Sequence, residues 1–297
     1  MKHAYLFTAN GNLKVLASCL RMLDYPSNDI YIIFDRKSSR NIDLLKSLLS
    51  KIEKADVKYL GLKTVNWGYS QVDAVMDLID SAIESGVDYQ YLHFLQNSDL
   101  PIKSNCDILQ FFDEHNGEEF VNVERKSSAW AEKCCQYRYL LSHNRFYRKS
   151  KIIKGINLCI ARLQRMIGIR INEDIPLYYG SALFSITLSF AKYMSERREE
   201  IEHRFRWALA PDEKFIQTML MNSPFSEKVA NSESCSTSNA VLIDWKRSRA
   251  KNSPHVWRSD EFDFILSCSA KYCFARKFME NVDIEIVQRI ENHFLQS

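Results

Sequence analysis

The segment Pro211-Asp212-Glu213 places two carboxylates directly before an expected helix over residues 214–221. Acidic side chains near a helix start are stabilised by the helix dipole, which is a sufficient structural reason for their presence. The same position also suits a general base, because a carboxylate in a fixed turn can accept a proton from a reacting hydroxyl group. This segment alone leaves both interpretations open.

Polar residues follow apolar runs at two further places. Asp35 and Asn97-Ser98-Asp99 each come directly after a run that is expected to be a strand. A carboxylate at such a point can contact a ligand, although a capped proline turn explains the second segment equally well. Between them, Trp67-Gly68 precedes a helix for which Ser70 is the expected N-cap, an arrangement that suits an anionic or sugar ligand. A simple capped turn explains that segment too.

Three later segments complete the set of candidates. Gly180-Ser181 lies between aromatic residues and allows a ligand to approach the backbone closely, although packing alone also explains it. Arg258 and Lys277 each lie in a segment that combines cations with aromatic rings. Cations of this kind can neutralise a departing anionic group.

These candidates depend on elements that alternate between strands and amphipathic helices. Short β-rich runs are separated by segments with apolar residues at helical spacing, which indicates βαβ units and a mainly parallel sheet. Such sheets bind ligands beyond the carboxyl ends of their strands, where Asp35 and Asp99 fall. The chain has neither G-x-G-x-x-G nor a P-loop, which disfavours dinucleotide and Walker-type sites. The expected strands cover residues 4–9, 29–34, 57–60 and 89–95, and the expected helices cover residues 13–23, 42–52 and 70–85.

The composition is that of a globular chain with a large core. The 297 residues are 46% hydrophobic and 26% charged with a net charge of +3, which excludes a disordered chain and a generally basic nucleic-acid binder. None of the eight cysteines forms C-x-x-C or completes a zinc pattern, so we expect mostly buried, reduced thiols.

Two segments bear on the location of the protein. The nearly uncharged residues 175–194 contain Pro176 and Gly180 and are expected to be a strand followed by a helix rather than a membrane span. The first residues are expected to be a strand rather than a signal peptide. Both features favour a cytoplasmic protein, with a peripheral position on the inner face of the cytoplasmic membrane as a further option.

The balanced total charge hides one strongly basic region, residues 133–170. It contains ten lysines and arginines and no aspartate or glutamate, with interleaved aromatic residues and then aliphatic residues at helical spacing. One interpretation is a solvated helix face packed on the core. A second is contact with an anionic membrane surface, because basic amphipathic helices lie in membrane interfaces. A third, nucleic-acid binding, has no support elsewhere in the chain.

Six motifs occur in a characteristic order between about residues 4 and 285. They are Phe34-Asp35-Arg36-Lys37, Trp67-Gly68-Tyr69-Ser70, Ser98-Asp99-Leu100-Pro101-Ile102-Lys103, Gly180-Ser181-Ala182, Pro211-Asp212-Glu213 and Phe274-Ala275-Arg276-Lys277-Phe278. Together they resemble the core-2/I-branching β-1,6-N-acetylglucosaminyltransferase family, glycosyltransferase family 14, in a bacterial-type member. The resemblance implies an α/β fold with a GT-A-like, Rossmann-related domain, in which helices flank a mainly parallel central sheet.

On this basis we expect a single glycosyltransferase domain over residues 1–297. Its expected parts are a nucleotide-binding half at about 1–125, the basic amphipathic segment at about 133–170, and an acceptor and catalytic half at about 171–297.

The resemblance also implies roles for individual residues. Glu213 corresponds to the family's catalytic base, which takes the proton of an acceptor hydroxyl as its oxygen attacks the anomeric carbon with inversion. The family lacks the Asp-x-Asp metal motif and uses a basic pair to neutralise the leaving diphosphate. Lys277 matches the lysine of that pair and Arg258 the arginine, with Arg247, Arg249 and Arg276 as rivals. The remaining matches are Asp35, Arg36, Trp67, Gly68, Ser70 and Asp99 on the nucleotide or donor side, and Gly180, Ser181 and Asp212 on the acceptor side.

We therefore expect an inverting transferase that needs no cofactor or metal, although weak metal binding at Asp99 stays an alternative. It would move a sugar, first of all GlcNAc, from a UDP-sugar to a glycan or lipid-linked glycan in bacterial surface polysaccharide synthesis. UDP-xylose, UDP-galactose and UDP-glucose stay open as donors. A non-catalytic nucleotide-sugar or glycan-binding protein on the same scaffold is the alternative from another class. No nucleic acid is expected as a partner.

Overall fold

The computed structural model describes residues 1–124, 128–144, 146–147, 149–230, 238–248, 250 and 253–295. Within these residues a six-stranded central sheet has the order β3-β2-β1-β4-β7-β6. The first four strands of this order pair in parallel, and β7 pairs antiparallel with both of its neighbours. The strands are β1 (Lys2–Ala9), β2 (Asn28–Asp35), β3 (Asp56–Lys63), β4 (Tyr89–Gln96), β6 (Phe120–Val121) and β7 (Phe184–Thr187).

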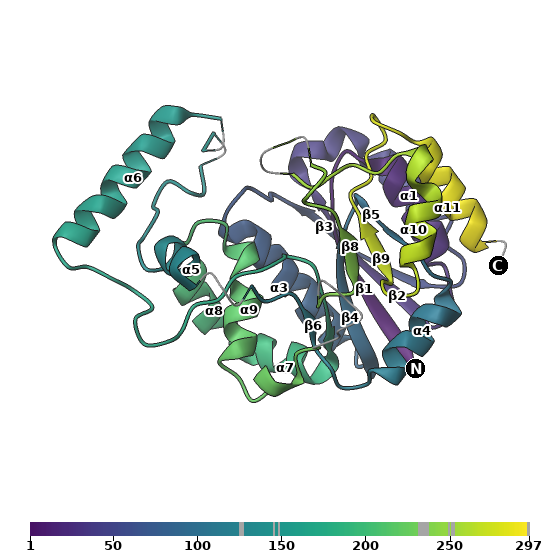
Figure 1. Ribbon diagram of the computed structural model, residues 1–297, viewed down its shortest axis with the longest axis horizontal. Coiled ribbons are helices and arrows are strands. Elements are labelled where there is room, and N and C mark those ends of the chain that lie inside the picture. Colours follow the sequence, from purple (N-terminus) through teal and green to yellow (C-terminus); the bar gives the residue numbers. More distant parts are fainter. Residues whose placement is uncertain are drawn as a thin grey trace.

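Helices cover both faces of this sheet, which is why its inner strands β1, β2 and β4 are buried along almost their whole length. Figure 1 shows one helix layer on each side. One layer contains α1 (Leu13–Met22), α2 (Ile42–Leu49), α4 (Asn105–Glu114), α10 (Phe262–Cys268) and α11 (Glu285–Leu295). The other contains α3 (Tyr69–Glu84), α7 (Leu188–Glu196), α8 (Arg198–Phe205) and α9 (Phe215–Met221).

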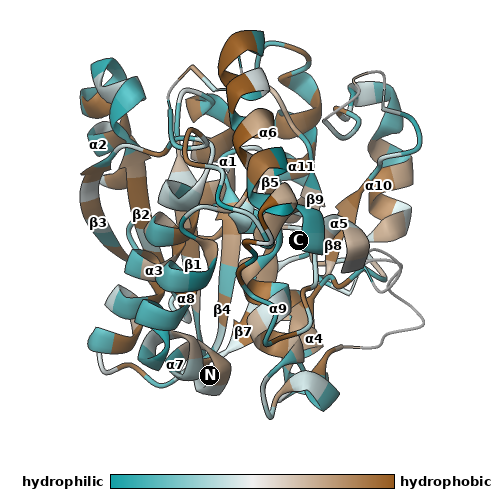
Figure 2. Cartoon of the chain, turned by 90° about the vertical axis from the view of Figure 1, so that its left-hand side faces the viewer, coloured by the Kyte–Doolittle hydropathy of each residue, from teal (hydrophilic) through white to brown (hydrophobic). Residues whose placement is uncertain are grey.

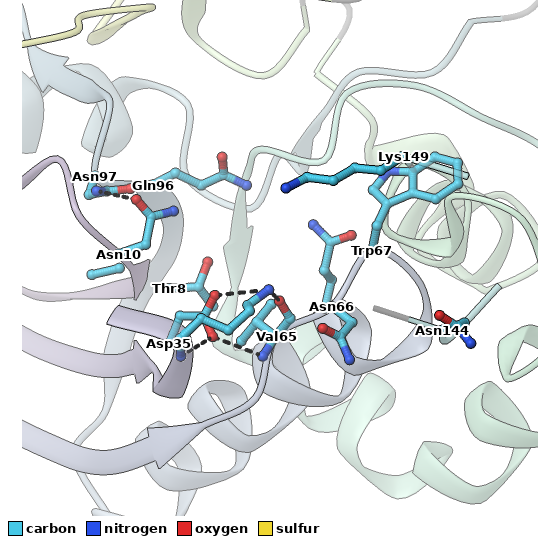
Figure 3. Close-up of a pocket in the computed structure, with 13 residues that line it drawn as sticks. Thr8, Asn10, Asp35, Val65, Asn66, Trp67, Gln96, Asn97, Asn144 and Lys149 are labelled. Carbon is cyan, nitrogen blue, oxygen red and sulfur yellow. Dashed lines mark hydrogen bonds and ion pairs between the residues drawn. The ribbon is translucent and has the colours of Figure 1, made fainter. Parts of the chain in front are cut away.

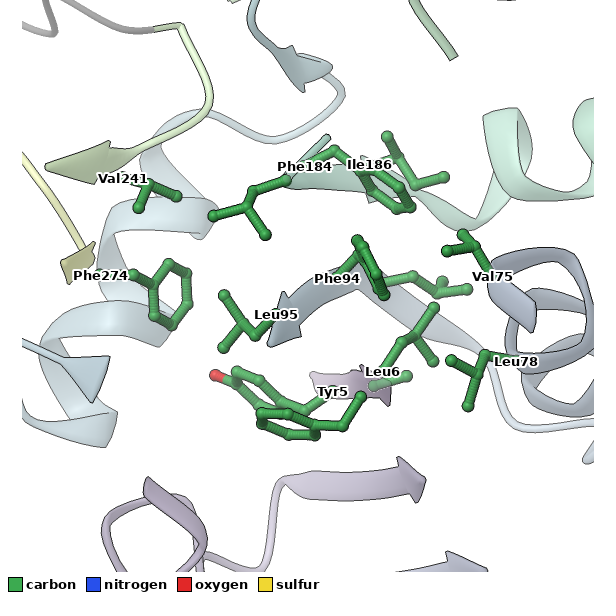
Figure 4. Packing of buried hydrophobic residues seen from close by; sticks show 14 of the residues in the cluster. Tyr5, Leu6, Val75, Leu78, Phe94, Leu95, Phe184, Ile186, Val241 and Phe274 are labelled. Carbon is green, nitrogen blue, oxygen red and sulfur yellow. The ribbon is translucent and has the colours of Figure 1, made fainter. Parts of the chain in front are cut away.

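A small second sheet has the order β5-β9-β8 and packs against the central one. Its strands are β5 (Asp99–Pro101), β8 (Val241–Ile243) and β9 (Phe274–Arg276). The Phe274 ring lies edge-on to Tyr5 with ring centroids 6.3 Å apart, and Figure 4 shows both rings in the core beside Leu95. The C-terminal motif is thereby held close to the ends of β1 and β4.

Short 3-10 helices and two further α-helices complete the described chain. The 3-10 helices are η1 (Arg36–Asn41), η2 (Pro211–Glu213), η3 (Ser226–Lys228) and η4 (Ser259–Glu261). α5 (Ser128–Cys135) and α6 (Lys151–Met166) belong to the basic region, and α6 stands away from the body of the molecule (Figure 1).

The expected α/β fold with a mainly parallel, helix-flanked sheet is confirmed. The expected strands correspond to β1 to β4, and the stretch 175–194 holds β7 followed by α7. One local prediction is wrong. Ser70 is not the N-cap of α3, because the helix begins at Tyr69 with Gly68 as its N-cap, and the Ser70 hydroxyl instead bonds the backbone of Asn66.

The cysteines and the long helices bear on two further expectations, reduced thiols and the absence of a membrane span. No disulfide joins two of the described cysteines, and Cys19, Cys134, Cys135 and Cys273 among them are buried; Cys235 lies outside the described residues. Among the described helices, none combines the length and the apolar character that crossing a bilayer requires.

Candidate functional site

A cavity of about 320 Å³ opens at the carboxyl ends of β1, β2 and β4. The chain passes from β1 outward to β2 and β3 and then returns to β4 on the other side of β1. Such a reversal of strand order leaves a crevice at the sheet edge, which is where open α/β sheets bind ligands. The cavity is lined by Thr8, Ala9, Asn10, Asp35, Lys37, Val65, Asn66, Trp67, Gln71, Gln96, Asn97, Asn144 and Lys149. We call it the donor pocket, because it contains Asp35 and Trp67, two residues expected on the donor side.

Asp35 is fixed at one wall of the donor pocket. Its Oδ1 accepts a hydrogen bond from the backbone N–H of Lys37 at 3.1 Å and from that of Val65 at 3.4 Å, and its Oδ2 lies 3.2 Å from the Lys37 ammonium. Figure 3 shows this cluster beside Thr8. Arg36, expected on the donor side, is exposed and donates to the carbonyl of Leu62 without lining the pocket. Lys37 therefore supplies the cation at this wall.

Trp67 forms the opposite wall with a residue far along the chain. Its ring stacks on Tyr147 with centroids 5.5 Å apart and an interplanar angle of 14°. Gly68 has φ +141°, and an added Cβ there would lie 3.4 Å from the carbonyl oxygen of Ser142. A glycine at this point therefore lets Ser142 and His143 approach the start of α3.

Lys149 and Asn144 line the same pocket, although both belong to the basic region and neither is expected there. Figure 3 shows Lys149 and Gln96 pointing toward one another across the pocket. With Lys37, Lys149 brings a second ammonium group to a site of largely amide side chains. The sequence signal for it was the local excess of cations, which does not reveal which of them faces a pocket.

Asp99 lies behind the pocket rather than in its wall. Its side chain is fully buried, its Oδ2 accepts from the backbone N–H of Gln96 at 2.9 Å, and its Oδ1 accepts from Arg276 at 3.1 Å. Burial raises the pKa of Asp99, against the opposing effect of the Arg276 guanidinium. Arg276 also donates to the Gln96 side chain at 2.6 Å, so this ion pair positions a residue of the donor pocket.

The chain following β9 brings the expected basic pair into one neighbourhood. The backbone N–H of Trp257 donates to the carbonyl of Lys277 at 3.0 Å, and the Lys277 ammonium lies 3.2 Å from the hydroxyl of Ser253. Ser253 and Arg258 line a second cavity of about 360 Å³. Arg276, the residue before Lys277, donates a hydrogen bond to the side chain of Gln96, which lines the donor pocket.

The rival arginines differ in how they are paired. Arg247 forms ion pairs with Asp244 and Glu261, and Arg276 is paired with Asp99. Arg258 is exposed and forms no ion pair within the described part of the chain. Arg249 lies outside the described residues.

Glu213 lies in η2, which packs against α3. Its carboxylate is half-exposed and is 3.8 Å from the ammonium of Lys214, which is fully buried and donates to the carbonyl of Ala210 at 3.1 Å. Ala210 has φ +44°, a left-handed conformation that costs a residue with a Cβ roughly 1–2 kcal/mol. Such strain is typical of backbone held in place at functional sites.

The backbone of Gly180 lies against the backbone of Glu213. Its N–H donates to the Glu213 carbonyl at 2.9 Å, and an added Cβ would lie only 1.9 Å from the carbonyl oxygen of Asn122. The Ser181 N–H donates to the Asn122 side chain and its hydroxyl accepts from Leu183, so Ser181 is used in packing the turn. Asp212 lies half-buried in η2 itself. Of these acceptor-side matches, Gly180 contacts Glu213 directly and holds its backbone, and Asp212 precedes it in the same turn.

The described residues contain no group of three or more His, Cys, Asp or Glu side chains that could hold a metal ion. At the turn after β4, the carboxylate of Asp99 instead faces a guanidinium. The donor pocket carries the ammonium groups of Lys37 and Lys149, which suit an anionic ligand. The second cavity carries the guanidinium group of Arg258 together with the carboxylates of Asp260 and Glu261.

A family model described as Core-2/I-Branching enzyme matches residues 3–267, most of the chain. The chain belongs to this family. The match covers the donor pocket, η2 and the region of Arg258, and it ends before Lys277. The membership expected from the ordered motifs is confirmed.

Curated relatives match this core-2/I-branching family member over almost its whole length. Xylosyltransferase 2 of Rattus norvegicus is 20% identical over 310 residues, which cover 99% of this chain and 34% of the relative. Xylosyltransferase sqv-6 of Caenorhabditis briggsae is 23% identical over 319 residues, which cover 100% of this chain and 37% of the relative. The chain thus spans about a third of the length of these relatives.

Among solved structures, apo mouse xyloside xylosyltransferase 1 matches 75% of this chain and 83% of its own, with 13% identity and a TM-score of 0.37.

Proposed function

We propose that the chain is an inverting glycosyltransferase that moves a sugar from a UDP-sugar to a glycan hydroxyl, with Glu213 as the catalytic base. The observation that carries this proposal is the presence of three features in one fold. They are a polar pocket at the strand-order reversal, a fixed and accessible carboxylate in η2, and a cationic neighbourhood behind β9.

Glu213 can perform the proton transfer because its carboxylate is held but still reachable. The hydrogen bond from Gly180 and the turn of η2 fix its backbone, while its side chain is 50% exposed and so can meet an acceptor hydroxyl. In the proposed step Glu213 takes the hydroxyl proton, the acceptor oxygen forms a bond to the anomeric carbon, and the bond from that carbon to the UDP oxygen breaks. General base catalysis of this kind typically contributes ~10²–10⁴-fold in rate.

The leaving UDP carries the negative charge that the reaction develops. Arg258 and Lys277, together with Lys37 and Lys149 of the donor pocket, are the cations available to receive it. Fixed cations can replace a metal ion in this role, because each stabilises charge at the departing oxygen. We therefore propose transfer without a metal.

The donor sugar is the open part of this proposal. GlcNAc follows from the motif resemblance, whereas the names of the curated relatives point to xylose. Xylose lacks the C6 hydroxymethyl group and the N-acetyl group of GlcNAc, so a comparison of UDP-xylose with UDP-GlcNAc tests the size of the sugar subsite. We propose a glycan or lipid-linked glycan of the cell surface as acceptor.

Glu213→Gln tests the assignment of the base. The amide has nearly the shape of the carboxylate but cannot take the proton, so transfer should fall by about 10²–10⁴-fold while UDP affinity is retained. Glu227→Gln, a change at an exposed glutamate in η3, is the matched control and should behave as the wild type. Wild-type turnover in Glu213→Gln would refute the assignment. UDP binding without transfer or hydrolysis in the wild type would instead identify a nucleotide-sugar-binding protein.

A further inference from the structure

α6 is attached to the rest of the molecule along one narrow face. Of its sixteen residues only Asn157 and Ala161 are buried. The Asn157 side chain accepts from the backbone N–H of Leu141 at 3.1 Å, and the Gln164 side chain exchanges hydrogen bonds with the backbone of Arg138. Figure 1 shows the helix standing out beyond α5, so most of its surface meets solvent.

The outward face of α6 is apolar. Ile152 is 75% exposed, Leu163 57% and Met166 83%, and Ile156 is exposed as well. At 100° per residue these four side chains fall within an arc of about 80°, on the opposite side from the two buried positions. Figure 2 shows the hydrophobic colour along this helix. An isolated exposed leucine is ordinary, but a continuous aliphatic stripe on a projecting helix marks an interaction surface.

Cations border this stripe on one side. Lys151, Arg162 and Arg165 occupy the neighbouring arc of α6, and Lys154 lies farther round the helix, beside the buried Ala161. Between α5 and α6 lies a cavity of about 630 Å³ whose lining includes Lys133, Arg162, Arg165 and Arg170, with Glu132 as an acidic lining residue. Within the described residues, Lys133, Arg162 and Arg165 form no ion pair with a carboxylate, whereas Arg170 lies 3.5 Å from Glu173.

We infer that α6 and the cavity between α5 and α6 form a docking surface for an anionic lipid bilayer. The apolar stripe inserts among the acyl chains, and the lipid phosphates meet the arginines and lysine of the cavity. A helix of this length lies within the interface, since basic side chains beside an aliphatic stripe match headgroups above and acyl chains below. This inference goes beyond the proposed function, because the surface binds lipid whether or not sugar is transferred.

Two other occupants fit the surface less well. A nucleic acid would satisfy the cations but would leave the aliphatic stripe in water. A second copy of the chain would cover the stripe, but a two-fold interface would bring the same unpaired cations of both copies together. An anionic bilayer satisfies both features at once.

Vesicle co-sedimentation tests this inference directly. The wild type should bind vesicles with about 30% phosphatidylglycerol and bind pure phosphatidylcholine much more weakly, with a loss of binding at high salt. Arg162→Gln/Arg165→Gln should weaken binding to anionic vesicles about 30-fold, since each cation near the surface contributes about a fivefold factor. Leu163→Ser/Met166→Ser should weaken it by at least about tenfold, because two inserted side chains are lost.

Matched controls separate docking from general effects. Leu44→Ser changes an exposed leucine on α2. Lys46→Gln/Lys51→Gln removes one exposed lysine on α2 and one just after its end. Both should bind vesicles as the wild type does. The α6 substitutions replace solvent-exposed side chains, so unchanged circular dichroism and thermal midpoints should confirm that the variants fold.

Three outcomes would overturn the inference. Equal binding to neutral and anionic vesicles would show that the cations do not contribute to vesicle binding. Tighter, salt-dependent binding to duplex DNA would assign the surface to nucleic acid, and self-association abolished by Leu163→Ser/Met166→Ser would assign it to a second copy of the chain. None of these measurements uses a sugar nucleotide, so failure of the proposed transfer reaction leaves the vesicle result unaffected.

Discussion

Replacing Gly180 by alanine should damage both the packing of the η2 turn and the reaction that depends on it. Gly180 faces the backbone of Asn122, where an added Cβ would lie 1.9 Å from the carbonyl oxygen and 2.8 Å from the carbonyl carbon. Its N–H also holds the Glu213 carbonyl at 2.9 Å. Because the obstacle is backbone rather than a flexible side chain, the new methyl group must displace one of the two segments.

The size of the effect follows from these distances. An ordinary contact needs at least about 3.4 Å, so Gly180 and Asn122 must separate by about 1.5 Å. Overpacking of this kind typically costs 1–3 kcal/mol of stability. If the segment of Gly180 moves, Glu213 moves with it, and a displacement of about 1 Å at a catalytic group can cost ~10²-fold in rate. Neither Gly180 nor Glu213 lines the donor pocket, so UDP affinity should be retained.

Three measurements check the prediction: the thermal midpoint, UDP affinity by calorimetry and the initial rate of transfer. Gly155→Ala is the matched control, because an added Cβ on α6 meets nothing within 4 Å and should stabilise the helix by up to about 1 kcal/mol. A Gly180→Ala variant with the wild-type midpoint and turnover would show that the contact with Asn122 relaxes without moving Glu213, and the positioning argument would be wrong.

Three further predictions concern charge. Burial raises the pKa of Glu119 to about 7. Between pH 4.5 and 7 the folded protein therefore keeps a proton that the unfolded chain has lost. The free energy of unfolding should fall by about 3 kcal/mol as the pH rises through that range. Glu119→Gln should remove this part of the slope in urea titrations, and an unchanged slope would contradict it. Lys149→Gln should weaken UDP binding about tenfold while Lys151→Gln does not, and equal affinities would remove Lys149 from the site. Transfer should continue after dialysis against EDTA, whereas activity restored only by added Mg²⁺ would contradict metal independence.

The central fold is predictable from the sequence because its signals are local. β1, β2 and β4 are short runs rich in aliphatic and aromatic residues, and the apolar spacing of residues 70–85 matches the buried face of α3. The alternation of these elements then restricts the sheet to a mainly parallel one. The cap of α3 was less predictable, because Gly68 with φ +141° takes the place expected for Ser70.

The site was predictable only in part, because its contacts join residues far apart in the chain. Nothing local to Asp99 shows that Arg276, 177 residues later, occupies its carboxylate. Nor does the sequence around Gly180 show that Asn122 leaves no space for a Cβ. The motifs predict these residues as a group, but packing decides which of them line the donor pocket and which lie behind it.

The cations of the basic region, which form one signal in the sequence, lie on two different surfaces of the structure. Lys149 lines the donor pocket beside Trp67, whose ring stacks on Tyr147. In contrast, α6 begins at Lys151 and carries its cations beside its exposed apolar stripe. A bilayer docked on α6 would therefore lie next to the wall of the donor pocket without contacting the pocket itself. Variants of Arg162 and Arg165 should then change vesicle binding at constant UDP affinity, and Lys149→Gln should do the reverse. If both kinds of variant changed both properties, the two surfaces would be energetically coupled, and this division of the basic region would be wrong.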